Sequence, residues 1–450
     1  MLHGPIGSKI MQFALPLAAT GILQQLFNAA DIAVIGRFVG KNAMAAVGSN
    51  SPVIALIISL FTGISIGANV TISRLIGQQR KADVSRAVHS ALLFAFTGGI
   101  VFACICELLS ERILRCMSSP EQVFGMALLY FRVYIAGMPV ILLYDFASAV
   151  FRSHGNTRTP LICLLTSGII NVILNLFFVA VLHMTVNGVA LATVLANLIS
   201  SVLLIYFLMK EQSEIHFAFS SLRIDKKLLK DMVRIGLPAG IQGMVFAFSN
   251  IIIQTSINQL DADVMAASSA AFNIEIFAYY MVNSFGQACT TFVGQNYGAG
   301  QPERCLKATR ISFLQDMAVT VGLSLLILLL GKPLLHLFND DPAVIEIGLI
   351  RLRYILLAEG INVVIEILSG CMRGYGYSFV PALICTAGIC GVRIAWVYLV
   401  FRPAPAFPTL MTAYPLSWAV TAAALIAAYL FLRNVKMRDF FRTAQTHQKN

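Results

Sequence analysis

Charged residues are scarce in this chain. Only 12% of its 450 residues are Asp, Glu, Lys or Arg, whereas a soluble globular protein has about 25%. Two long segments, 42–73 and 159–209, contain none. A run of roughly 20 apolar residues is enough to cross a bilayer as a helix. The composition excludes an ordinary soluble protein and predicts an integral membrane protein surrounded by lipid.

Negative charge is the scarcer sign, with 21 acidic against 32 basic residues and a formal net charge of +11. In a membrane protein such an excess usually reflects cytoplasmic loops rich in Lys and Arg. We therefore expect no nucleic-acid partner. If the N-terminus is cytoplasmic, most Lys and Arg residues fall in inside loops, so we predict a multi-pass protein of the plasma (inner) membrane with both termini cytoplasmic.

Reactive and metal-ligating groups are also sparse. The nine cysteines include no Cys-x-x-Cys pair and mostly lie in apolar segments, which is typical of small buried side chains. The seven histidines do not cluster with them. No nucleophile with its base and no cofactor fingerprint is present. We therefore expect no enzyme, no catalytic residue, no metal site and no cofactor.

An internal repeat is what the sequence does contain. The segment from Leu15 to Gly40 returns about half the chain later, where Leu237-Pro238 corresponds to Leu15-Pro16 and Asn250 to Asn28. Turn markers repeat in the same order; for example, the Arg, Gly and Pro at 152, 155 and 160 correspond to those at 373, 376 and 381. So many coincidences in order indicate a duplication.

The repeat and the apolar segments predict the fold class: an all-α integral membrane protein with twelve transmembrane helices in two pseudo-symmetric six-helix bundles. Each half has an even number of crossings, so both halves enter the membrane with the same orientation. Such a pair of bundles suits alternating access. The predicted domains are an N-terminal bundle (1–210), a cytoplasmic linker (211–228), a C-terminal bundle (229–435) and a cytoplasmic tail (436–450).

Acidic residues inside predicted helices are the candidate site residues. A carboxylate at mid-membrane costs on the order of 2.5–3.5 kcal/mol on insertion scales, so such residues are rare and mark functional sites by default. The candidates are Asp31, Asp145, Glu275, Asp316, Glu359 and Glu366. In the second repeat Ile253 occupies the place of Asp31, so the two halves have diverged at this acidic position.

The chain resembles the multidrug and toxic compound extrusion (MATE) family. The motifs that carry the resemblance are LPLAATGILQQLFNAADIAVIGRFVG, VGQNYGAGQPERC, and the paired turns AVFRSHGNTRTP and GCMRGYGYSFVP. The resemblance implies a secondary transporter that exports small organic, often cationic, compounds by H⁺ or Na⁺ antiport. Some family members carry an acidic residue in the seventh helix as part of a Na⁺ site, and this chain has none there.

Asp31 matches the acidic position of the first helix that the family associates with cation coupling. We expect it to alternate between a protonated and a charged or Na⁺-bound form, with Asn28 and Gln24 as polar neighbours; Asn28 shares its helix face. The alternative is a structural ion pair of Asp31 with Arg37 or Lys41.

A second group of candidates forms a substrate or ion cavity: Glu275, Asn273, Tyr279, Glu359, Asn250 and Gln254. A carboxylate beside aromatic rings suits an organic cation. The alternative for Glu275 is a structural pair with a basic residue of a neighbouring helix. Asp145 and Glu366 occupy equivalent places in the repeat, each seven residues before an Arg, which favours a gating or structural role. Arg393 needs a partner, for which Glu359 or Glu366 would serve, and Asp316 receives no role.

Two other functions compete with drug export. A flippase or exporter of a lipid-linked or endogenous substrate would have a strongly cationic cavity, and intramembrane basic residues are few here. A polytopic membrane enzyme would need a clustered catalytic constellation, which the sequence lacks. We expect a monomer.

Overall fold

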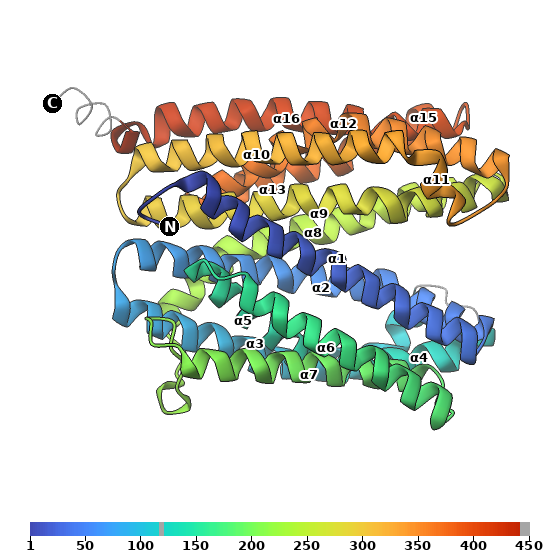
Figure 1. The fold of residues 1–450 in the computed structure, drawn as a ribbon, viewed down its shortest axis with the longest axis horizontal. Helices are drawn as coiled ribbons and strands as arrows, with labels where there is room; N and C mark the ends of the chain where they lie inside the picture. Colours follow the sequence, from blue (N-terminus) through green and yellow to red (C-terminus); the bar gives the residue numbers. More distant parts are fainter. Residues whose placement is uncertain (117–120, 442–450) are drawn as a thin grey trace. The chain divides into compact units, whose positions relative to one another are not determined.

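The computed structural model describes residues 1–116 and 121–441, which form helices and contain no strand (Figure 1). Ten helical segments of this part are long and apolar enough to cross a membrane, and a bent pair of helices forms an eleventh. A further long helix, α9 (Ala262–Gly298), lies where the eighth helix is predicted. Each predicted helix therefore has a counterpart, and the predicted all-α membrane fold is confirmed.

The first half of the chain contains α1 (Ile6–Phe38), α2 (Lys41–Gly77), α3 (Lys81–Cys116), α4 (Glu121–Ala136), α5 (Met138–His154), α6 (Arg158–Leu176) with its π-helical end η1 (Phe177–Val181), and α7 (Val186–Lys210). A single turn of 3₁₀ helix, η2 (Phe219–Ser221), lies in the linker. The second half contains α8 (Lys226–Ile257), α9, α10 (Pro302–Leu329), α11 (Gly331–His336), α12 (Pro342–Gly374), α13 (Phe379–Cys385), η3 (Thr386–Gly391), α14 (Val392–Trp396), η4 (Val397–Phe401), α15 (Phe407–Met411), α16 (Ala413–Phe431) and η5 (Leu432–Lys436).

One difference between corresponding helices of the two halves is a bend. α4 and α5 meet at Gly137 with a bend of 48°, whereas α12, their counterpart, is one continuous helix. Pro139 lacks the N–H that would continue the helical hydrogen bonds across the junction. A Cβ atom on Gly137 would lie 2.3 Å from Val194 of α7. The bend therefore depends on this Gly and Pro.

The helices form two compact units. The N-terminal unit comprises 19–76 and 80–233, and the C-terminal unit comprises 1–18, 77–79 and the chain from Arg234 onward. α1 thus begins in one unit and ends in the other. The turn at Gly77 belongs to the C-terminal unit, where a Cβ atom on this residue would lie 2.0 Å from the carbonyl oxygen of Gln295. The domain boundaries expected from the sequence stay a prediction.

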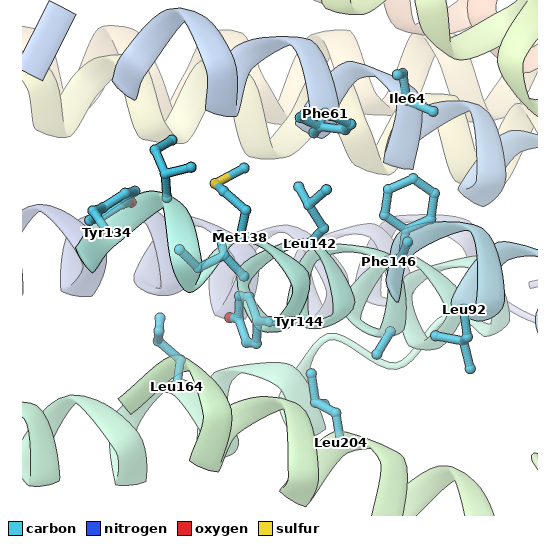
Figure 2. Packing of buried hydrophobic residues seen from close by; sticks show 14 of the residues in the cluster. Phe61, Ile64, Leu92, Tyr134, Met138, Leu142, Tyr144, Phe146, Leu164 and Leu204 are labelled. Carbon is cyan, nitrogen blue, oxygen red and sulfur yellow. The ribbon is translucent and has the colours of Figure 1, made fainter. Parts of the chain in front are cut away.

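Each unit has its own apolar core. In the N-terminal unit, Phe61 and Ile64 of α2 face Met138, Leu142 and Phe146 of α5 (Figure 2). All five side chains are at most 7% exposed.

In the C-terminal unit, the ring of Phe13 packs edge-on against Phe292 at 6.1 Å between centroids. Large apolar side chains also point outward; Leu108 is 85% exposed and Leu329 is 81% exposed. Exposed leucines within long apolar helices are suited to contact with lipid.

Candidate functional site

Asp31 lies in the part of α1 that belongs to the N-terminal unit, and only 9% of it is exposed. Two neutral side chains hold its carboxylate. Asn175 Nδ2 of α6 donates to Oδ1 at 2.5 Å, and Thr193 Oγ1 of α7 donates to Oδ2 at 3.2 Å. Asn175 also donates to Asn171 Oδ1 at 3.2 Å. Three helices therefore converge on one carboxylate.

The surroundings of Asp31 contain no counter-charge. No Lys or Arg of the described residues lies within ion-pair distance of its carboxylate, and the expected alternative partners Arg37 and Lys41 are exposed. Two buried tyrosines of α4, Tyr130 and Tyr134, stack at 6.1 Å and lie within the electrostatic reach of Asp31. The carboxylate of Asp31 therefore has hydroxyl and amide neighbours, but no Lys or Arg of the described residues neutralises its charge.

The polar neighbours expected from the sequence lie elsewhere. Asn28 and Gln24 are exposed side chains of α1, and neither hydrogen-bonds to Asp31 in the described structure. The residues that do bond to it, Asn175 and Thr193, were not among the sequence candidates. The sequence does contain a feature that singles them out, because both are polar side chains inside the charge-free segment 159–209.

Glu275 has a strong fixed partner. Arg351 Nη2 of α12 lies 2.6 Å from Oε1, and Nε donates to Oε2 at 3.1 Å. Arg351 also donates to Ser268 Oγ of α9 at 2.7 Å. Glu275 is 7% exposed and Arg351 is 4% exposed. Both carboxylate oxygens of Glu275 are thus occupied, as the structural alternative predicted.

Arg393 lies on α14 with 1% exposure, and its partners differ from those expected. It forms an ion pair with neither Glu359 nor Glu366 in the described structure, so the predicted pairing is wrong. Its Nε donates to Ser417 Oγ at 3.2 Å and its Nη1 to Asn250 Oδ1 at 3.3 Å. Its guanidinium also lies 4.1 Å from the ring centroid of Tyr414. Polar and aromatic groups therefore stabilise this cation instead of a carboxylate.

The other cavity candidates do not gather around one carboxylate. Glu359 of α12 is 3% exposed and accepts from Asn362 at 3.1 Å. Asn273 donates to a carbonyl of its own helix, and Gln254 bonds to Asn258 one turn away. Tyr279 packs against Tyr280 at 5.8 Å. Among the described residues, the one hydrogen bond that joins two of these candidates links Asn250 to Arg393.

The symmetric charges Asp145 and Glu366 lie within α5 and α12, about two turns before each helix ends. Arg152 Nη2 donates to the backbone carbonyl of Asp145 at 3.5 Å. Arg373, which is 8% exposed, donates to Gln242 Oε1 of α8 at 3.1 Å. Each Arg thus has a hydrogen bond near a helix end, and the roles of the two carboxylates remain predictions.

The geometry of the N-terminal unit allows simple chemistry. Desolvation disfavours the charged form of a carboxyl group, and hydrogen-bond donors favour it. Asp31 experiences both influences without a permanent cation. Its carboxylate can therefore bind a proton or another small cation and release it again, whereas Glu275 already has Arg351.

Comparisons with known proteins show which family the chain belongs to. The sequence profile of the MatE family matches residues 16–177 and 238–399, one copy in each half. A probable multidrug resistance protein YoeA of Bacillus subtilis is 26% identical, with 93% of this chain and 92% of that protein covered. A probable multidrug resistance protein NorM of Thermotoga maritima is 27% identical, with 88% and 86% covered.

The fold is also similar to a solved structure, the outward-facing conformation of a multidrug resistance MATE family transporter, with a TM-score of 0.88. The two share 19% identity, and 98% of each chain is covered. At this identity the likeness shows the fold alone. Because the family profile covers both halves of the chain, the protein belongs to the MatE family of multidrug and toxic compound extrusion transporters.

Proposed function

We propose that this protein exports small organic, often cationic, compounds across the plasma membrane in exchange for H⁺ or Na⁺, through alternating access. It acts as a monomer, and Asp31 carries the coupling ion. The protein has no catalytic role in this proposal. The names of the relatives support drug export for those proteins, and the family membership extends the expectation to this chain.

One observation carries the proposal: Asp31 is a buried carboxylate with hydrogen-bond donors but no basic partner. In an antiporter the coupling group has to exchange its cation on each cycle. A carboxylate with a permanent Arg or Lys partner cannot do so without breaking an ion pair, which makes Asp31 better suited than Glu275.

The test is efflux of ethidium from proteoliposomes under an imposed H⁺ gradient and then under a Na⁺ gradient. Wild type is compared with Asp31→Asn and with Asp340→Asn, which changes an exposed loop carboxylate. We expect wild type and Asp340→Asn to export under one of the gradients, which identifies the coupling ion. Asp31→Asn, equally abundant in the membrane, should export no faster than empty liposomes.

Two results would contradict the proposal. If Asp31→Asn exports as wild type does, Asp31 is not the coupling carboxylate. If wild type exports no cation tested under either gradient, the rival substrate, a lipid-linked or endogenous metabolite, becomes the better hypothesis.

Thr193 provides a finer test of the same site. Thr193→Val keeps the shape of the side chain but removes the donor to Asp31 Oδ2. A hydrogen bond to a charged group contributes about 1.5–3 kcal/mol, and about 1.4 kcal/mol is a factor of ten. We expect efflux by Thr193→Val to fall about tenfold, while Thr193→Ser, which keeps the hydroxyl, stays close to wild type. Equal rates for Val and Ser would show that this bond does not matter for coupling.

A further inference from the structure

A line of polar side chains runs along one face of α10. These residues recur every three or four positions, and each is at most 8% exposed: Thr309, Ser312, Asp316, Thr320 and Ser324. At 1.5 Å per residue the line is about 22 Å long, which is most of a hydrocarbon core about 30 Å thick. Leu314 and Leu325, on other faces of the helix, are more than half exposed. α10 therefore directs its polar face inward, toward α9 and α12.

Asp316 is the acid in the middle of this line, and it is completely buried. Thr320 donates to Oδ1 at 2.8 Å. Its other oxygen, Oδ2, is buried as well and has no hydrogen-bond partner among the described residues. No ion pair of the described residues includes Asp316. A buried carboxylate oxygen without a donor or a cation is costly when charged, so this arrangement suits the neutral acid with its proton on Oδ2.

The groups around Asp316 point the same way. α12 brings two further carboxyl groups, those of Glu359 and Glu366, within electrostatic reach of Asp316. Cations act on these two groups, Arg393 on Glu359 and Arg373 on Glu366. Glu275 of α9 binds Arg351, Lys9 of α1 donates to a backbone carbonyl, and the thiol of Cys289 of α9 donates to the carbonyl of Ile367. Asp316 therefore has carboxyl neighbours but no ion-pair partner among the described residues, and carboxyl groups that lie close together cannot all be ionised.

A proton fits this place better than a metal ion. Hard cations take several oxygen ligands at once, and the hydrogen bonds around Asp316 supply one hydroxyl, that of Thr320. A proton needs only the single oxygen Oδ2.

We propose that Asp316 is a proton-binding site of the C-terminal unit, separate from Asp31, with Glu359 and Glu366 as its electrostatic neighbours. The role of this site in transport rests on the proposed antiport function, but proton binding at Asp316 can be measured without any transport. In a cycle, this site would bind and release a proton in the half of the protein that has Ile253 at the place corresponding to Asp31.

The test is infrared difference spectroscopy of the purified protein during a pH titration, which detects the C=O stretch of protonated carboxyl groups. Asp316→Asn should remove one such band from the wild-type spectrum. Thr320→Val, which removes the hydrogen bond at Oδ1, should shift that band without removing it. Asp31→Asn should remove a different band, and the losses should add in the double variant. Asp340→Asn serves as the control for an exposed carboxyl group.

The proposal is overturned if Asp316→Asn, with an unfolding temperature like that of wild type, leaves every protonated-carboxyl band in place. It is also overturned if Na⁺ at constant pH removes the Asp316 band, because the ligand is then a metal cation. A failure of ethidium export with the Asp316 band present would contradict the proposed function and not this site. The two hypotheses can therefore fail separately.

Discussion

Single residues show two solutions to the same physical problem. A charge inside a membrane protein needs a partner, and Glu275 obtains one from Arg351 whereas Asp31 receives only neutral donors. The first solution gives a fixed ion pair between α9 and α12. The second leaves the carboxyl group of Asp31 able to change its protonation state. This distinction is why we propose a structural role for Glu275 and ion exchange for Asp31.

The Glu275–Arg351 pair gives a prediction about stability. Arg351→Met removes one partner and leaves the buried Glu275 uncompensated, so we expect the free energy of unfolding to fall by about 3–5 kcal/mol. Thermal unfolding in detergent would measure this as a lower midpoint. The double variant Glu275→Gln/Arg351→Met should recover part of the loss.

Arg353→Met is the matched control, because Arg353 is an exposed Arg two residues along the same helix. It should change the free energy of unfolding by no more than about 1 kcal/mol. Equal midpoints for Arg351→Met and wild type would show that the buried pair contributes little.

Some of the site residues can be recognised from the sequence, and others cannot. Asp31 can be found because a carboxylate inside an apolar helix is costly and therefore conspicuous. Asn175 and Thr193 cannot be assigned to it in the same way, because they lie 144 and 162 residues away and only helix packing brings them together. Arg393 illustrates the opposite case: a buried cation suggests a carboxylate partner, but Ser417, Asn250 and the ring of Tyr414 stabilise it instead.

Among the helices, the close approach of α9 and α12 stands out. A Cβ atom on Gly370 would lie 2.4 Å from the carbonyl oxygen of Gly286 and 2.9 Å from Thr290 Oγ1. Helices in membranes associate through such small residues, which let their backbones come close. The sequence predicts both helices, but a glycine within a helix does not reveal which neighbour it packs against.

Gly370→Ala tests this contact. The added methyl group has to push a backbone carbonyl away, and overpacking typically costs about 1–3 kcal/mol. We expect a lower unfolding midpoint in detergent. Gly360→Ala on the same helix is the control, since the nearest atom to its Cβ would be Sδ of the flexible Met317 at 3.4 Å, an ordinary contact distance. If both variants unfold alike, the α9–α12 contact can adapt and the prediction is wrong.

For the whole molecule, the repeat made the helix order predictable, because each half constrains the interpretation of the other. The bend between α4 and α5 does not follow from the repeat, since its counterpart α12 is unbroken. A local feature that only one copy of a repeat carries cannot be inferred from the other copy.

The orientation in the membrane gives a further prediction at this scale. The Lys and Arg bias predicts that both termini are cytoplasmic, so alkaline phosphatase fused after Lys436 should be inactive and green fluorescent protein fused there should fluoresce. Fused after Asp340, which nine predicted crossings place outside, the phosphatase should be active because its disulfides form only in an oxidising compartment. The reverse pattern of activities would invert the predicted topology.

The assignment of 1–18 and 77–79 to the C-terminal unit has a consequence for the history of the protein. The repeat indicates that the two halves arose by duplication. The opening stretch of the first half and one of its turns now belong to the body of the second. A break of the gene at the linker would therefore not yield two self-sufficient halves, because the second product would lack pieces that only the first encodes.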